Sequence, residues 1–205
     1  MHLHARWRSI VSATTAALAV TALAASPASA DTAPSPGGCP DVPTVQPFAP
    51  WQDHADYFLA PGGDFEAGGS GWRLEDGASI VEGNEPFGGA PGDHRSLSLP
   101  AGASAATAPM CIGEEHRTMR YFAVGARTGS LAVEAVYTKA NGTQKRVPLG
   151  VAQGTGEWGP SDVVPMRVNE LAGDGDALSV SLRFSARGNT PWQVDDVYVD
   201  PYKMK

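Results

Sequence analysis

Histidine, cysteine and long apolar runs are all scarce in this chain of 205 residues. Only three histidines lie beyond residue 30, namely His54, His94 and His116, and they are too far apart in sequence to form a metal-binding motif. A serine nucleophile motif and a phosphate-binding loop are also missing. These absences argue against the common hydrolase and nucleotide-dependent classes. We therefore expect that the protein is not an enzyme.

The N-terminal residues have the pattern of an export signal. Arg6 and Arg8 precede an apolar segment from Ile10 to Ala24, and Ala28-Ser29-Ala30 is a small-residue cleavage site. The apolar segment is about fifteen residues long and contains hydroxyl side chains, so it is too short and too polar for a membrane span. The sequence predicts a signal peptide over residues 1–30 and a secreted, extracellular protein without a membrane span.

Negative charge dominates the remainder of the chain. Removing Arg6 and Arg8 with the leader leaves 13 basic side chains against 22 acidic ones, a net charge near −9. Nucleic acid and anionic membranes are unfavourable partners for such a surface. The acidity fits either simple solubility or cation binding. We expect a monomer.

Cys39 and Cys111 are the only cysteines. In an oxidising compartment, an isolated pair within one domain predicts a disulfide. This bond would hold a proline-rich arm, residues 39–61, against the body of the protein. Residues 31–38 are rich in glycine and proline with nothing to bury, and they are predicted to be a flexible leader.

Short strands separated by glycine- and proline-rich turns fill residues 62–205. The clearest alternation runs from residue 177 to 185, with apolar side chains predicted to face inward and polar ones outward. The inward set is Leu178, Val180, Leu182 and Phe184, and the outward set is Ser179, Ser181, Arg183 and Ser185. Asn141-Gly142 predicts a tight hairpin turn between strands at 130–138 and 144–149, and a further strand is expected at 163–171. The pattern predicts an all-β fold, an antiparallel β-sandwich of jelly-roll type.

Two adjacent carboxylates, Asp195 and Asp196, interrupt the last predicted strand. Burial and strand propensity both disfavour a carboxylate there, so a cation, backbone amides or an arginine must compensate them. Neighbouring residues on a regular strand point to opposite faces, so this pair is not expected to act as a hydrolase acid and base.

Three motifs resemble the opening and closing strands of galactose-binding-like jelly rolls, which include several carbohydrate-binding modules. They are Gly63-Asp64-Phe65-Glu66, Gly71-Trp72 and the segment from Trp192 to Val197. We expect the segment from Gly62 to Trp72 to meet the last stretch, from Thr190 to Tyr202. In that superfamily, carboxylates near the first and last strands commonly hold a structural calcium. The resemblance implies Asp64, Glu66, Asp195 and Asp196 as calcium ligands. The whole chain also resembles a group of small secreted actinobacterial proteins in which this domain stands alone.

Carbohydrate binding would require aromatic rings exposed near polar groups, because sugar C–H faces stack on such rings. Trp158 lies in a glycine-rich loop and is the best single candidate, and Trp51 and Phe87 are alternatives on other loops. Asn84 and Glu85 could supply polar contacts.

Two further tryptophans, Trp72 and Trp192, are expected to pack in the core beside the paired ends of the domain. The alternative function that the sequence leaves open is an extracellular protein-interaction or structural domain without sugar binding.

Overall fold

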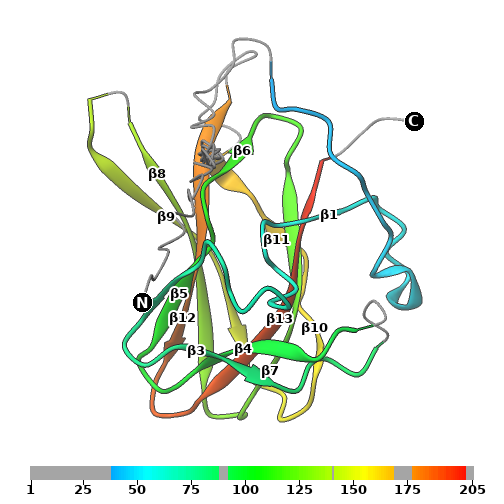
Figure 1. Ribbon diagram of the computed structural model, residues 1–205, viewed down its shortest axis with the longest axis vertical. Coiled ribbons are helices and arrows are strands. Elements are labelled where there is room, and N and C mark those ends of the chain that lie inside the picture. The colour runs from blue at the N-terminus through cyan, green and yellow to red at the C-terminus, as the bar shows by residue number, and fades with distance from the viewer. Residues whose placement is uncertain (1–37, 88–91, 140, 169–176, 202–205) are drawn as a thin grey trace, which may run out of the picture. The chain divides into compact units, whose positions relative to one another are not determined.

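The structure is a computed structural model that describes residues 38–87, 92–139, 141–168 and 177–201. The predicted signal peptide and residues 31–37 of the predicted leader lie outside these ranges. Two antiparallel sheets pack against each other, as expected for a jelly-roll β-sandwich (Figure 1). Within the described ranges, no helix is long and apolar enough to cross a membrane.

Seven strands form the first sheet. Its order is β10 (Gly159–Pro160), β7 (Thr118–Gly125), β13 (Trp192–Asp200), β4 (Arg95–Leu99) and β3 (Ser79–Glu82), while β1 (Phe58–Leu59) pairs with β13 and β11 (Val164–Pro165) pairs with β7. Six strands form the second. Its order is β2 (Arg73–Glu75), β5 (Ser104–Ala106), β12 (Leu178–Arg187), β8 (Ser130–Thr138) and β9 (Gln144–Gln153), while β6 (Met110–Ile112) pairs with β12.

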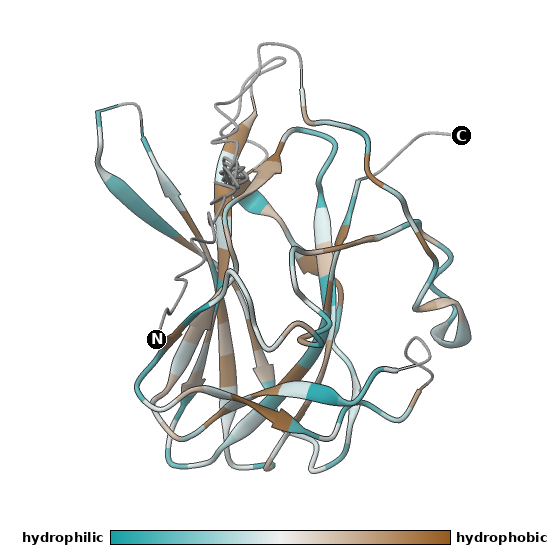
Figure 2. Ribbon diagram, in the orientation of Figure 1, coloured by the Kyte–Doolittle hydropathy of each residue, from teal (hydrophilic) through white to brown (hydrophobic). Residues whose placement is uncertain are grey.

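The alternation predicted for residues 177–185 is confirmed in β12. Val180, Leu182 and Phe184 are completely buried between the sheets, and Leu178, at the start of the strand, is half-buried. The outward set is exposed or half-buried, namely Ser179, Ser181, Arg183 and Ser185. Figure 2 shows hydrophobic residues recurring along the strands of both sheets. Trp72 and Trp192 are also buried in this core, as predicted, and Trp72 stacks on Phe184 with ring centroids 6.1 Å apart.

The hairpin around Asn141-Gly142 is confirmed, because β8 pairs with β9 from Thr138 and Gln144 onward. The return strand extends to Gln153, beyond the expected end at residue 149. The strand expected at 163–171 is shorter, since β11 covers only Val164–Pro165 and residues 169–171 lie outside the described ranges. Pro165 has no N–H to donate to the ladder, which fits a short pairing.

The N-terminal arm covers the outer face of the seven-stranded sheet. The predicted bond between Cys39 and Cys111 is present. A short 3₁₀ helix, η1 (Ala49–Trp51), follows Phe48, whose ring packs 5.1 Å from that of Phe122 on β7. Buried apolar contacts and a covalent bond therefore both hold the arm in place.

The segments predicted to meet, around Gly63 and around Val197, do lie side by side. The N–H of Val197 donates to the carbonyl of Gly63 at 3.2 Å, and the N–H of Ala60 donates to the carbonyl of Val197 at 2.8 Å. A Cβ atom on Gly63 would lie 2.9 Å from the Val197 oxygen, so only glycine allows this approach. The contact brings the Asp64 segment to the last strand.

Candidate functional site

A β-bulge in β13 determines where the two adjacent carboxylates point. The pairing of β13 with β7 shifts between Asp195 and Tyr198, and Asp196 has a φ of +47°, in the left-handed region. Both side chains consequently lie against the loop that follows β3. The expectation that they diverge to opposite faces is wrong here, because it assumed a regular strand.

Three carboxylates from the loop and the bulge form a compact acidic cluster, which consists of Glu85, Asp93 and Asp196. One oxygen atom from each lies within 4.8 Å of the others. Asp195 is completely buried beside the cluster and accepts hydrogen bonds from the N–H of Glu85 at 3.1 Å and the N–H of Asp196 at 2.9 Å. Asp195 thus positions the cluster through backbone amides, one of the compensations expected from the sequence.

The acidic cluster has the electrostatics of a cation site. Burial, together with the neighbouring acids, raises the pKa of Asp195 to about 8 and that of Asp196 to about 7. Burial likewise raises the pKa of Asp93, whose two carboxylate oxygens are enclosed without a protein hydrogen-bond donor in bonding geometry. Enclosed oxygens of this kind fit a hard cation such as Ca²⁺, so these residues could hold a metal ion.

The remaining predicted ligands, Asp64 and Glu66, surround the cluster. Asp64 is close enough for its charge to raise the pKa of Asp196. Glu66 Oε1 accepts hydrogen bonds from the N–H groups of His94 and Arg95, both at 2.7 Å, so one of its oxygens is already engaged. The sequence pattern missed Glu85 and Asp93 as metal-ligand candidates, although both flank a glycine-rich loop.

A second group of donor atoms, from Cys39, Glu115 and His116, lies within 4.8 Å. The sulfur of Cys39 is bonded to Cys111, so it is not available as a thiolate ligand in this oxidised state.

The aromatic candidates gather on the arm side of the sandwich. The rings of Trp51 and Phe87 meet edge to face at 5.0 Å, and Trp158 packs against the same cluster of Phe48 and Phe122. Trp51 and Trp158 are half-buried, whereas Phe87 is 42% exposed. The loop that carries Asn84 and Glu85 also carries Phe87, so the five predicted ligand-binding residues lie in one region. Most of the ring surface of the three aromatic residues is used in packing.

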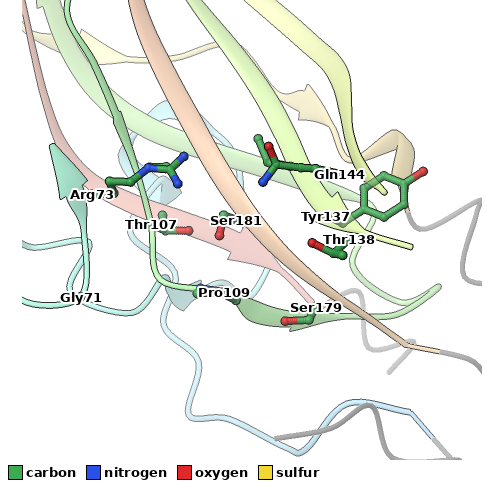
Figure 3. Close-up of a pocket in the computed structure, with 11 residues that line it drawn as sticks. Gly71, Arg73, Thr107, Pro109, Tyr137, Thr138, Gln144, Ser179 and Ser181 are labelled. Atoms are coloured by element: carbon green, nitrogen blue, oxygen red, sulfur yellow. The ribbon is translucent and has the colours of Figure 1, made fainter. Parts of the chain in front are cut away.

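A polar cleft lies on the opposite side, over the outer face of the six-stranded sheet (Figure 3). Its volume is about 320 Å³. Its polar lining comes from side chains on four strands and one loop, namely Arg73, Thr107, Thr138, Gln144, Ser179 and Ser181. Sequence alternation identified the two serines as outward-facing, but it did not identify a cleft.

The cleft offers many hydrogen-bonding groups in a small space. Arg73, Thr138, Gln144 and Ser179 are exposed, and Tyr137 and Pro109 add apolar surface to the wall. Hydroxyl, amide and guanidinium groups beside a ring are the contacts that orient a polyhydroxylated ligand.

Comparison with known proteins gives likeness in structure only. No family model matches the chain, and no curated protein matches it in sequence. The N-terminal CBM22-1–CBM22-2 tandem domain of Paenibacillus barcinonensis Xyn10C aligns with a TM-score of 0.50 and 14% identity over 71% of this chain and 46% of that one. The CBM22-1 xylan-binding domain of the same protein aligns with a TM-score of 0.48 and 14% identity over 69% of this chain and 92% of that one.

TmCBM61, solved with beta-1,4-galactotriose, aligns with a TM-score of 0.41 and 16% identity over 67% of this chain and 94% of that one. Some other matching chains are enzymes. Identities this low carry no activity or ligand from one protein to another. The chain has the jelly-roll β-sandwich fold that carbohydrate-binding modules also have.

Proposed function

We propose that this chain is a secreted, non-catalytic module that binds carbohydrate in the cleft over the six-stranded sheet. The observation that carries the proposal is the cleft itself, where side chains such as Arg73, Gln144 and Ser181 converge around a volume of about 320 Å³. A sugar presents hydroxyl groups on several sides, and converging donors and acceptors can bond them simultaneously. The signal-peptide pattern of residues 1–30 supports export to where polysaccharides are found.

The acidic cluster has a structural part in this proposal, as a calcium site. Calcium takes six to eight oxygen ligands, and Glu85, Asp93 and Asp196 supply carboxylates, with Asp64 close by. The ion would join the loop after β3 to the bulge in β13, and it would neutralise charges that otherwise repel. Because the cluster contacts the seven-stranded sheet and the cleft lies on the other sheet, the ion is not expected to contact the sugar.

Polysaccharide binding tests the cleft directly. Isothermal titration of the purified protein with soluble polysaccharides, neutral and charged, should give saturable binding to at least one. Gln144→Ala and Thr138→Ala each remove an exposed hydrogen-bonding group from the wall of the cleft. Each is expected to weaken binding by up to about tenfold, the equivalent of about 1.4 kcal/mol.

Trp158→Ala is the matched control, because it alters the aromatic region on the opposite face. Its binding should equal that of the unaltered protein, with folding checked by thermal unfolding. If Trp158→Ala abolishes binding and Gln144→Ala does not, the sugar binds on the arm side. If no polysaccharide binds, the carbohydrate function is wrong, and an extracellular protein-interaction or structural role becomes the better proposal.

A further inference from the structure

Charge is distributed unevenly over this protein. The chain as a whole carries a net charge of −7, yet the outer face of the six-stranded sheet is positive. Strand register and burial assign to that face the charged side chains of Arg73, Arg146, Arg183 and Arg187, and of Glu75 and Glu134. Four arginines and two glutamates give this face a net charge of +2 among the described strands.

Both glutamates on this face are already paired. Glu75 lies 3.1 Å from Arg73 and 3.5 Å from Arg183, and Glu134 lies 3.3 Å from Arg183. Ser104 also donates to Glu75, at 3.1 Å. The carboxylates are therefore engaged by Arg183 and Arg73. Arg73 contacts Glu75 through its Nε atom, and a guanidinium carries five N–H donors, so the pair uses only part of its bonding capacity.

Arginines flank the cleft from opposite edges of the sheet. Arg73 lies on β2, one edge strand, and lines the cleft with 57% of its side chain exposed. Arg146 lies on β9, the other edge strand, and is exposed. It is paired in register with Val136, a residue of the cleft wall, and lies two positions after Gln144 on the same face. Among the described residues that line the cleft, none is acidic.

Guanidinium groups are suited to one kind of sugar substituent. The planar fork of an arginine matches the two oxygens of a carboxylate, and a charge-assisted pair of this kind is stronger than a neutral hydrogen bond. A neutral sugar would leave Arg73 paired with Glu75 alone and would give Arg146 no opposite charge. A chain of sugars bearing carboxylates would fill the cleft and neutralise the positive charge at both edges.

We propose that the ligand of this cleft is an acidic polysaccharide whose sugars carry carboxylate groups, held between Arg73 on β2 and Arg146 on β9. This inference rests on the proposed carbohydrate function and specifies its substrate class. The chain as a whole carries a net charge of −7, which disfavours non-specific attachment of such a polymer and favours binding at this positive face.

The test compares three soluble polymers by isothermal titration: polygalacturonate, a neutral β-galactan and dextran sulfate. Polygalacturonate is expected to bind at least about tenfold more tightly than the galactan. Raising NaCl from about 0.01 M to about 1 M shortens the screening length from about 30 Å to about 3 Å and should abolish most of that difference.

Single substitutions locate the effect. Arg146→Gln and Arg73→Gln should each weaken polygalacturonate binding about tenfold, since each removes a charge-assisted contact. Lys145→Gln is the matched control: it makes the same charge change one residue away on β9, on the opposite face, and should bind normally. Both Arg146 and Lys145 are exposed, so neither change should impair folding.

Each outcome separates this inference from the proposed function. Equal or tighter binding of the galactan, insensitive to salt and to both arginine variants, would overturn the acidic-ligand inference and leave the carbohydrate function standing. Binding of dextran sulfate alone would overturn the choice of carboxylate. If Lys145→Gln weakens polygalacturonate binding as much as the arginine variants do, only net charge matters, and the assignment of the site to Arg73 and Arg146 is overturned. No binding of any polymer would overturn both proposals.

Discussion

Adding calcium to the chelated protein at about pH 8 is expected to raise its unfolding temperature by roughly 5–10 °C. A ligand that binds only the folded state at a hundred times its dissociation constant contributes about 2.7 kcal/mol, and each kcal/mol shifts the midpoint of a domain of this size by about 2–4 °C. The physical source is the acidic cluster of Glu85, Asp93 and Asp196, where the carboxylate oxygens of Asp93 are enclosed and lie close to other acids. Differential scanning calorimetry with and without a chelator measures the shift.

The rise in unfolding temperature that calcium causes should increase with pH. In the chelated protein, the folded-state pKa values of Asp195 and Asp196, about 8 and about 7, exceed the ordinary value of 3.8. Between about pH 4 and about pH 8 the folded state therefore binds more protons than the unfolded state. Its free energy of unfolding consequently falls as the pH rises through this range. Calcium competes with those protons. The rise in unfolding temperature should be small near pH 5 and largest near pH 8.

One substitution separates a cation site from general charge repulsion. Asp196→Asn removes a ligand and a buried charge together, so it should eliminate the calcium response without lowering the unfolding temperature of the chelated protein at about pH 8. Glu157→Gln, at an exposed loop position, should respond to calcium as the unaltered protein does. An identical midpoint with calcium and with chelator at about pH 8 would remove the cation from the proposal.

The β-sandwich was predictable from the sequence because inward and outward residues alternate within single strands. In β12, Leu182 and Phe184 alternate with Ser181 and Arg183, and no knowledge of distant residues is needed to assign their faces. The disulfide and the contact between the Gly63 and Val197 segments were also predicted, from a single cysteine pair and from a resemblance. Each of these features can be inferred from a few residues without knowing how the strands are ordered in the sheets.

The residues that make up the acidic cluster are harder to predict from the sequence. Asp195 and Asp196 stand out because carboxylates are unusual within a strand, but the bulge that turns both toward one loop depends on how β13 pairs with β7. Glu85 and Asp93 lie in a loop, where acids are ordinary, so nothing in the sequence distinguishes them from solvated residues. Only the folded chain shows that they are enclosed beside Asp196.

The cleft was missed for a different reason. Ser179 and Ser181 were correctly assigned to the outer face, yet a row of serines is also what an ordinary solvated sheet presents. Arg73 and Gln144 join them from strands on either side of the sheet, and this convergence is a property of strand order. Aromatic rings in loops are the sequence feature that suggests a sugar site, but Trp51 and Trp158 are half-buried in the packing of the arm.

Loss of the disulfide is expected to lower the unfolding temperature by roughly 10 °C. Cys39 and Cys111 are 72 residues apart, and closing a loop of that length contributes about 4 kcal/mol in the chain-entropy model, which converts to this shift for a domain of this size. The double variant Cys39→Ser, Cys111→Ser should still fold, because the arm keeps other attachments. Arg120 pairs with Asp53 at 2.7 Å, and Tyr57 donates to the same carboxylate at 2.8 Å.

If the disulfide stabilises the arm, chemical reduction and mutation should lower the unfolding midpoint to the same temperature. A phosphine reductant should lower the midpoint of the unaltered protein to that of the double variant and leave the double variant unchanged, with free thiols counted in parallel. An unaltered protein that shows two free thiols but keeps its midpoint would contradict the prediction. The contacts of Asp53 with Arg120 and Tyr57 would then be sufficient to hold the arm, and the covalent bond would add no measurable constraint to the folded domain.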